Sequence, residues 1–178
     1  MLITNREDRY GIVAILLHWI MAVLIIGLLV EGIYMVRIPV SLQKLQLFGW
    51  HKELGVLVFM LVTCRLMWRL GNITPELESV LTVPELFAAR TVHYLFYVCM
   101  FLMPVTGWLL TASAGLPVSF FGLFVIPNPI APNEQSMALY TSIHKWLGYF
   151  LILLICGHVS AALKHHFINK DNVLRRML

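Results

Sequence analysis

Charged side chains are scarce in this sequence. Asp, Glu, Lys and Arg make up only 12% of its 178 residues, whereas a typical soluble domain carries about 25%. Hydrophobic residues make up 60% of the chain. So little charge cannot cover a water-facing surface, and the composition therefore excludes an ordinary soluble domain and predicts an integral membrane protein.

Proline, glycine and cysteine are also limited. Eight Pro and eleven Gly are too few for a low-complexity or collagen-like chain. The three cysteines, Cys64, Cys99 and Cys156, show neither the C-x-x-C spacing of a metal or redox site nor the C-x-x-C-H spacing of a covalently attached cofactor. We expect all three to be buried small hydrophobic residues.

Four charge-poor runs have the length of a membrane span, since a helix needs about 20 apolar residues to cross the hydrocarbon layer. They are residues 11–34, 50–70, 91–113 and 139–163. The second run spans the membrane only if its charged residues lie at the two interfaces. The pattern predicts an all-α membrane protein, a bundle of four transmembrane helices that forms a single domain over residues 1–178.

The distribution of Lys and Arg predicts the orientation of the bundle. Only four of the 13 basic residues lie on the side of the first connection, namely Arg37, Lys44, Lys52 and Lys145. The other nine lie near both termini and in the second connection, so we expect both termini in the cytoplasm. The proline-rich, apolar segment 114–138 on the outer side is expected to cap the bundle as a lid.

Histidine is the residue type that stands out within the spans. Five of the seven histidines lie there: His18, His51, His93, His144 and His158. Ionisable residues inside a membrane are rare and indicate function. At a rise of 1.5 Å per residue, His18 and His158 lie at one inner depth, and His51 and His144 lie at one outer depth. The fourth helix supplies one histidine to each pair, on nearly the same face.

Small residues follow four of these histidines by one helical turn, where a larger side chain would collide with a bound macrocycle. They are Ala22, Gly55, Gly148 and the pair Ala161 and Ala162. His93 is instead followed by Phe96 and Tyr97, so we do not predict it as an axial ligand. Small residues also mark ordinary helix packing, and that alternative stays open.

Two stacked pairs of imidazoles suit two non-covalently bound haems b. Zinc would require about four clustered ligands, and each layer offers two histidines. Because two imidazoles leave no open position on the iron, the pattern favours electron transfer over oxygen binding. It therefore predicts that electrons pass between the two faces of the membrane.

The same residues resemble the prokaryotic cytochrome b561 family over nearly the whole chain. The matching elements are His18-Trp19, His51 with Gly55, Arg65 with Arg69, His93 with Tyr97, Pro104 with Gly107, His144 to Tyr149, Gly157-His158, His165 to Phe167 and Lys170 to Asn172. The resemblance implies a bacterial inner-membrane location. It also implies that His18 and His158 ligate the cytoplasmic haem and that His51 and His144 ligate the periplasmic one.

Within that family, the superoxide oxidase type is the model that the resemblance favours, with superoxide as the periplasmic electron donor and ubiquinone as the acceptor. Lys52 and Lys145 adjoin the outer ligands and would attract a small anion, although ordinary interfacial lysines explain them equally. The resemblance places the quinone near the cytoplasmic haem, with His165, His166 and His93 as candidates. These side chains can also be plain headgroup-level histidines.

A different class of function remains open. The chain can instead be a non-catalytic di-haem subunit that relays electrons for a partner dehydrogenase or hydrogenase, or that takes them from another small periplasmic donor. We expect no nucleic-acid partner. Arg65, Arg69 and Arg90 either pair with haem propionates or serve only as positive-inside residues, and Glu31 receives no role from the sequence.

Overall fold

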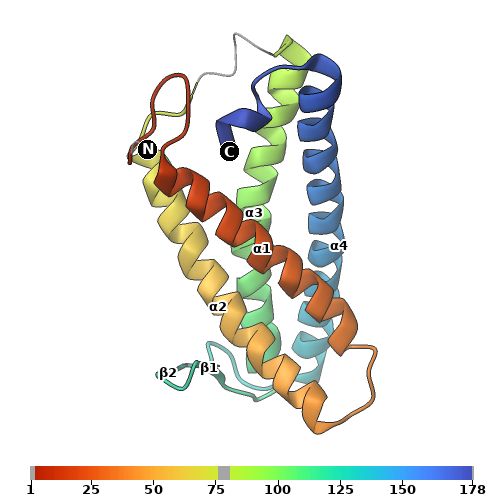
Figure 1. The fold of residues 1–178 in the computed structure, drawn as a ribbon. Helices are drawn as coiled ribbons and strands as arrows, with labels where there is room; N and C mark the ends of the chain where they lie inside the picture. Colours follow the sequence, from red (N-terminus) through yellow and green to blue (C-terminus); the bar gives the residue numbers. More distant parts are fainter. Residues whose placement is uncertain (1–2, 76–80, 178) are drawn as a thin grey trace.

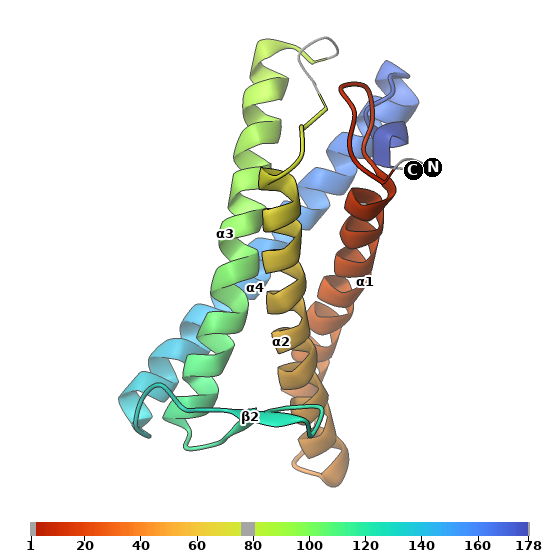
Figure 2. The same ribbon diagram turned by 90° about the vertical axis from the view of Figure 1, so that its left-hand side faces the viewer.

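Four long α-helices dominate the computed structural model, which describes residues 3–75 and 81–177. In this part of the chain they are α1 (Ile12–Met35), α2 (Leu42–Leu70), α3 (Val83–Ser113) and α4 (Glu134–Lys164). Helices α3 and α4 run side by side, and α1 and α2 cross them obliquely (Figure 1). A quarter turn shows the N-terminus and C-terminus close together at one end and the α3–α4 connection at the other (Figure 2).

Two of the helices begin well before the apolar runs that predicted them. Helix α2 begins at Leu42, where the Ser41 side chain accepts a hydrogen bond from the Lys44 amide at 3.2 Å. Helix α3 begins at Val83 behind a reciprocal cap between Thr82 and Glu85. Polar residues at these ends form caps and continue the helix, so the helices are longer than their apolar segments.

Close backbone contacts join α1 with α2, α2 with α3, and α3 with α4. The buried core lies midway along the bundle and consists of apolar side chains. One cluster contains Met21, Val62 and Met100, and a second contains Cys99, Leu151 and Leu154. Van der Waals packing of this kind is what holds helices together inside a membrane, where lipid is as apolar as the core.

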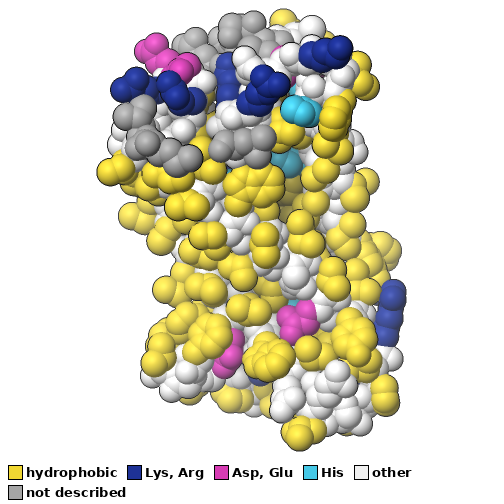
Figure 3. Space-filling view, in the orientation of Figure 1, with side chains coloured by type: hydrophobic (Ala, Val, Ile, Leu, Met, Phe, Trp, Pro, Cys, Tyr) yellow, Lys and Arg dark blue, Asp and Glu magenta, His cyan; other side chains and the backbone are white. Residues whose placement is uncertain are grey.

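Three of the helices in the described ranges are long and apolar enough to cross a membrane: α1, α3 and the segment Glu134–Asn169 that contains α4. Helix α2 is not among them, because charged residues occur along it, Lys52 and Arg65 included. Length and composition therefore support three of the four predicted spans. Apolar side chains cover much of the outer surface, and basic side chains gather at the end that carries both termini (Figure 3).

A short β-hairpin occupies the connection between α3 and α4, which differs from the all-α prediction. Strands β1 (Val118–Phe120) and β2 (Phe124–Ile126) pair antiparallel. The turn between them places Phe121 at φ 47° and Gly122 at φ 72°, the left-handed values of a tight hairpin turn. Because aromatic and β-branched residues form the two strands, this segment pairs with itself and contacts α2 and α3.

The cysteine prediction was wrong for two of the three residues. Cys99 is buried, but Cys64 and Cys156 are exposed. In a bundle surrounded by lipid the outer surface is as apolar as the core, so a small hydrophobic side chain is tolerated on either side.

The chain after α4 folds back toward α1. A π-helical turn (His165–Asn169) ends at Lys170, which adopts a left-handed conformation with φ 55°, and a short 3-10 helix (Leu174–Met177) follows. The indole Nε1 of Trp19 donates a hydrogen bond of 2.7 Å to the Met177 carbonyl. The C-terminal segment is thus attached to the first helix, one residue from His18.

Candidate functional site

The inner layer of histidines forms where α1, α3 and α4 meet. His18 of α1 and His158 of α4 have ring centroids 6.2 Å apart, with an interplanar angle of 64°. His93 of α3 lies 5.9 Å from His158, and Phe96 lies 5.4 Å from it. The structure therefore brings His93 to the predicted inner pair, beside aromatic rings.

The outer layer repeats this spacing with different helices. His51 of α2 and His144 of α4 also have ring centroids 6.2 Å apart, with an interplanar angle of 75°. Helix α4 supplies one member of each pair. Its two histidines are fourteen residues apart, and this separation places them on nearly the same face of the helix. The apolar clusters around Met21 and Cys99 lie between the layers.

Both separations fit a metal held between two imidazoles. With a metal–nitrogen bond of about 2 Å on each side, two imidazoles on opposite faces of one iron have ring centroids about 6 Å apart. A bare metal ion is a different case: among the described residues, no three His, Cys, Asp or Glu side chains come together as a metal site. The geometry suits two paired ligands per layer, as a haem requires.

Hydrogen bonding fixes the orientation of one outer histidine. The Thr106 hydroxyl lies 3.1 Å from Nδ1 of His144 and donates to the Met103 carbonyl at 2.9 Å. Since its own hydrogen is engaged, the hydroxyl accepts from Nδ1–H of His144. The other ring nitrogen, Nε2, is then the unprotonated one and is free to bind iron.

The partner histidine, His51, has no hydrogen bond that fixes the orientation of its ring. Nδ1 of His51 is buried and makes no hydrogen bond, and the Glu31 carboxylate oxygen Oε2 lies 3.6 Å away. That distance is too long for a hydrogen bond. An unpaired buried nitrogen of this kind is rare in native proteins and calls for a physical explanation.

Two glycines from neighbouring helices allow the outer histidines to pack closely. A Cβ added at Gly32 of α1 would lie 3.2 Å from Cε1 of His51, and one added at Gly107 of α3 would lie 3.2 Å from Cε1 of His144. Gly55, which the sequence singled out, has open space beside it. Gly32 was not predicted, because it belongs to α1 whereas His51 belongs to α2, and residue spacing within one helix does not indicate contacts with another.

The inner end of the bundle is electropositive. Arg65 of α2 lies close enough to His18, His93 and His158 to interact electrostatically with all three. The Arg69 guanidinium lies 5.6 Å from the centre of the Tyr97 ring, a cation–π distance. Anionic groups such as haem propionates would be stabilised at this end.

His165 and His166 lie at the same end but in different surroundings. His165 is buried, and its Nδ1 lies 2.6 Å from Oδ2 of Asp171 and 3.2 Å from the Asn169 amide. Burial alone would raise the pKa of Asp171, but hydrogen bonds from His165 and from the Val173 amide leave that pKa below its usual value. His166 is half-buried and packs against Phe167, so its imidazole is the less committed of the two.

Lys52 and Lys145 directly follow His51 and His144 in the sequence, and each already has a neighbour in the structure. The Lys52 ammonium donates to the Pro117 carbonyl at 3.3 Å, at the start of the hairpin segment. The Lys145 ammonium lies 5.5 Å from the Trp146 ring centre. Both contacts are exposed and weak, so they leave the positive charge available to an anion.

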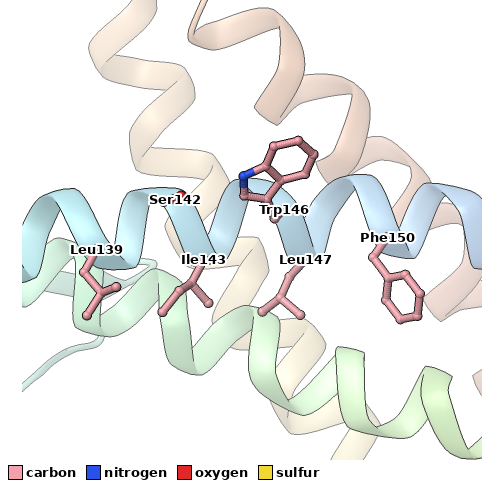
Figure 4. A pocket seen from close by; sticks show the side chains of 6 residues that line it. All are labelled: Leu139, Ser142, Ile143, Trp146, Leu147 and Phe150. Atoms are coloured by element: carbon pink, nitrogen blue, oxygen red, sulfur yellow. The ribbon is translucent and has the colours of Figure 1, made fainter.

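A shallow groove on α4 lies apart from these layers. Six residues from that helix alone line it: Leu139, Ser142, Ile143, Trp146, Leu147 and Phe150. Figure 4 shows their side chains spread along the helix, largely apolar in character. Since no other helix contributes, this groove is best described as lipid-facing surface.

Comparison with known proteins agrees with this architecture. The family model described as prokaryotic cytochrome b561 matches residues 9–178. "Cytochrome b561 homolog 2" of Escherichia coli (strain K12) is 33% identical over 183 residues, which cover 98% of this chain and 94% of the relative. "Cytochrome b561 homolog 1" of the same organism is 29% identical over 188 residues, which cover 96% and 97%.

A third relative, "Probable superoxide oxidase CybB" of Yersinia pestis, is 22% identical over 184 residues, which cover 97% of each chain. The family model and the relatives thus match the chain along nearly its full length. Long apolar helices are what a membrane protein of this family requires. The chain belongs to the prokaryotic cytochrome b561 family, whose members are membrane proteins that bind b-type haem and transfer electrons.

Proposed function

We propose that this protein carries electrons across the bacterial inner membrane through two haems b, from superoxide at the periplasmic face to ubiquinone. The observation that carries the proposal is the repeated 6.2 Å separation of two histidine pairs, His18 with His158 and His51 with His144. Haem supplies one-electron redox chemistry when bound, and the protein's part is to hold and orient it.

The four histidines would serve as axial ligands, two to each haem. Thr106 keeps His144 in the tautomer that offers Nε2 to the iron, and Gly32 and Gly107 leave room for the outer imidazoles. His93 lies on α3, beside His158 of α4, and it does not disrupt the pairing of His18 with His158. It is therefore assigned to the surroundings of the inner haem.

All four helices would cross the membrane, α2 included. Its charged residues flank the charge-free stretch 54–64, in which Val58 and Val62 are buried, and Lys52 and Arg65 on either side of that stretch would reach toward the two interfaces. Basic side chains gather at the end with both termini (Figure 3), and this enrichment supports the proposal that this end faces the cytoplasm. The chain forms one domain in this arrangement.

Superoxide is proposed as the donor because positive charge adjoins the outer pair. Lys52 and Lys145 each follow an outer histidine directly in the sequence. Two superoxide anions each lose one electron and become O₂. One ubiquinone takes up both electrons with two protons and becomes ubiquinol, so the reaction balances.

Quinone is proposed to bind at the inner end, where a proton donor is needed. His93 and His166 are better candidates than His165, whose Nδ1 is already bonded to Asp171. An imidazole can both hold and release a proton, so it can deliver protons to reduced oxygens.

The test is a measurement of quinone reduction by the purified protein in detergent, with a superoxide source as donor and with haem quantified by its reduced-minus-oxidised spectrum. We expect two haems per chain and superoxide-dependent reduction. The double variant Lys52→Gln/Lys145→Gln should lose about tenfold in rate at low salt, whereas Lys44→Gln at the same end should not. Absence of haem refutes the proposal, and haem without a superoxide response favours the relay for a partner dehydrogenase or hydrogenase.

A further inference from the structure

The two outer histidines face different oxygen atoms through Nδ1. The neutral hydroxyl of Thr106 accepts from His144, whereas the group beside Nδ1 of His51 is the carboxylate of Glu31, at 3.6 Å. Both side chains are largely enclosed, with 19% of the His51 side chain and 16% of the Glu31 side chain exposed. Glu31 lies near the end of α1 and is only partly buried, but a carboxylate withdrawn from water is still costly unless it has a partner.

No competing partner occurs for either group. In the residues that the structure describes, Glu31 and His51 make no other hydrogen bond or ion pair, and Nδ1 of His51 is one of two buried side-chain atoms without a partner, the other being Nε1 of Trp68. Gly32, which follows Glu31, lets the α1 backbone lie against the imidazole, with 3.2 Å from a built Cβ to Cε1. A side-chain rotation would be needed to shorten the 3.6 Å separation to about 2.8 Å, the length of a charge-assisted hydrogen bond.

We propose that Glu31 is a positioning residue for the outer haem: its carboxylate accepts Nδ1–H of His51, directs Nε2 toward the iron and lowers the midpoint potential of that haem. The inference rests on the ligand assignment in the proposed function. When a carboxylate accepts the hydrogen bond from Nδ1–H, the imidazole becomes a stronger electron donor through Nε2. Stronger donation stabilises the oxidised iron.

The inner layer lacks this arrangement. Among the described residues His18 and His158 have ring neighbours and no hydrogen bond, and their charged neighbour is the cation Arg65. A nearby cation stabilises the reduced iron. The outer haem then has the lower potential of the two, and electron transfer from the periplasmic side to the cytoplasmic side is favoured by the protein itself.

Three variants test the proposal by potentiometric titration of the haem-loaded protein. Glu31→Gln removes the charge and should raise the outer midpoint potential by about 59 mV, which corresponds to a tenfold change in the one-electron equilibrium constant. Glu31→Asp keeps the charge but shortens the reach, and should give a smaller rise. Glu53→Gln is the matched control, because it removes another half-buried carboxylate, two residues after His51 on α2, and it should shift the outer potential much less than Glu31→Gln does.

The outer potential is identified in a His158→Ala background, which retains that haem alone, and the low-spin ferric EPR signal gives a second readout of imidazole donor strength. Glu31→Gln should move that signal, and Glu53→Gln should move it much less. If Glu31→Gln and Glu31→Asp both bind two haems with unchanged potentials, or if inner and outer potentials shift equally, the inference is overturned while the proposed function stands. If His51→Ala retains both haems, the ligand assignment itself fails.

Discussion

The outer and inner histidine layers have the same ring separation of 6.2 Å but very different surroundings. Glycines abut both outer imidazoles, and oxygen atoms of Thr106 and Glu31 face their Nδ1 atoms. Aromatic rings and an arginine surround the inner pair. The same ring separation therefore occurs in two different electrostatic environments. In the proposed arrangement the histidines would bind the haems, and the residues around them would set the redox potentials.

The largest effect that distinguishes the layers should come from the histidines of α4. His144→Ala should remove the outer haem and His158→Ala the inner one, each leaving about half of the bound haem, because one imidazole holds haem weakly. Pyridine haemochrome spectra of monomeric, folded protein measure this. The control is His93→Ala, and retention of all haem by either α4 variant contradicts the assignment of the layers.

The glycine contacts should matter only in the outer layer. In Gly107→Ala the new methyl group would lie 3.2 Å from Cε1 of His144, so the imidazole must shift, and we expect outer-haem affinity to fall by about tenfold to 100-fold. Gly27→Ala adds a methyl group to α1 where nothing lies within 4 Å. Haem titration of the apoprotein should show a loss for the first variant and none for the second.

Thr106→Val should have a smaller effect on the same layer. It removes the hydroxyl beside Nδ1 of His144 with little change in shape and leaves the Met103 backbone as the other partner of that imidazole, at a cost of about 1 kcal/mol for one hydrogen bond. Outer-haem affinity should fall by about fivefold while the inner haem is unaffected. Thr106→Ser restores the hydroxyl and should recover the affinity; failure to recover it would show that the contact is packing alone.

The smallest effect should lie at the inner end, in the pair of His165 and Asp171. Asp171→Asn should lower the melting temperature at pH 7 by about 2–4 °C, the size expected for loss of about 1 kcal/mol. The folded pKa of Asp171 lies below its usual value, so its contribution is complete above the unfolded pKa of about 3.9. The contribution is lost as the pH falls through the folded pKa.

Thermal scans of both proteins between neutral and acidic pH check this prediction. The two melting temperatures should converge as the carboxyl group of the unmodified protein becomes protonated. A difference that stays constant into acid would show that the charge of Asp171 does not stabilise the fold.

The long helices were predictable because their apolar runs are local features of the chain. The ends of α2 and α3 were not placed correctly, although Ser41 and the Thr82–Glu85 cap were signals that a search for capping residues finds. The hairpin was not predicted, because its pairing depends on the backbone conformation at Phe121 and Gly122. The prolines of segment 114–138 do not indicate that conformation.

The depth of each histidine follows from a fixed rise per residue, which is why depth alone groups His18 with His158 and His51 with His144. The neighbours of those histidines depend on how separate helices are rotated and shifted against each other. Glu31 is twenty residues before His51 in the chain, and the proximity of its carboxylate to Nδ1 follows from the packing of α1 on α2. No periodicity within one helix contains that information.

The hydrogen bond from Trp19 to the Met177 carbonyl joins residues that are 158 positions apart, and the neighbouring inner pair likewise combines the first long helix with the last. During synthesis, His18 enters the membrane long before His158 is made. The inner cofactor site therefore does not exist on the nascent chain. A haem held by this pair, as proposed above, would be inserted late, after translation, and the newly made first helix would have to persist in the bilayer until α4 arrives.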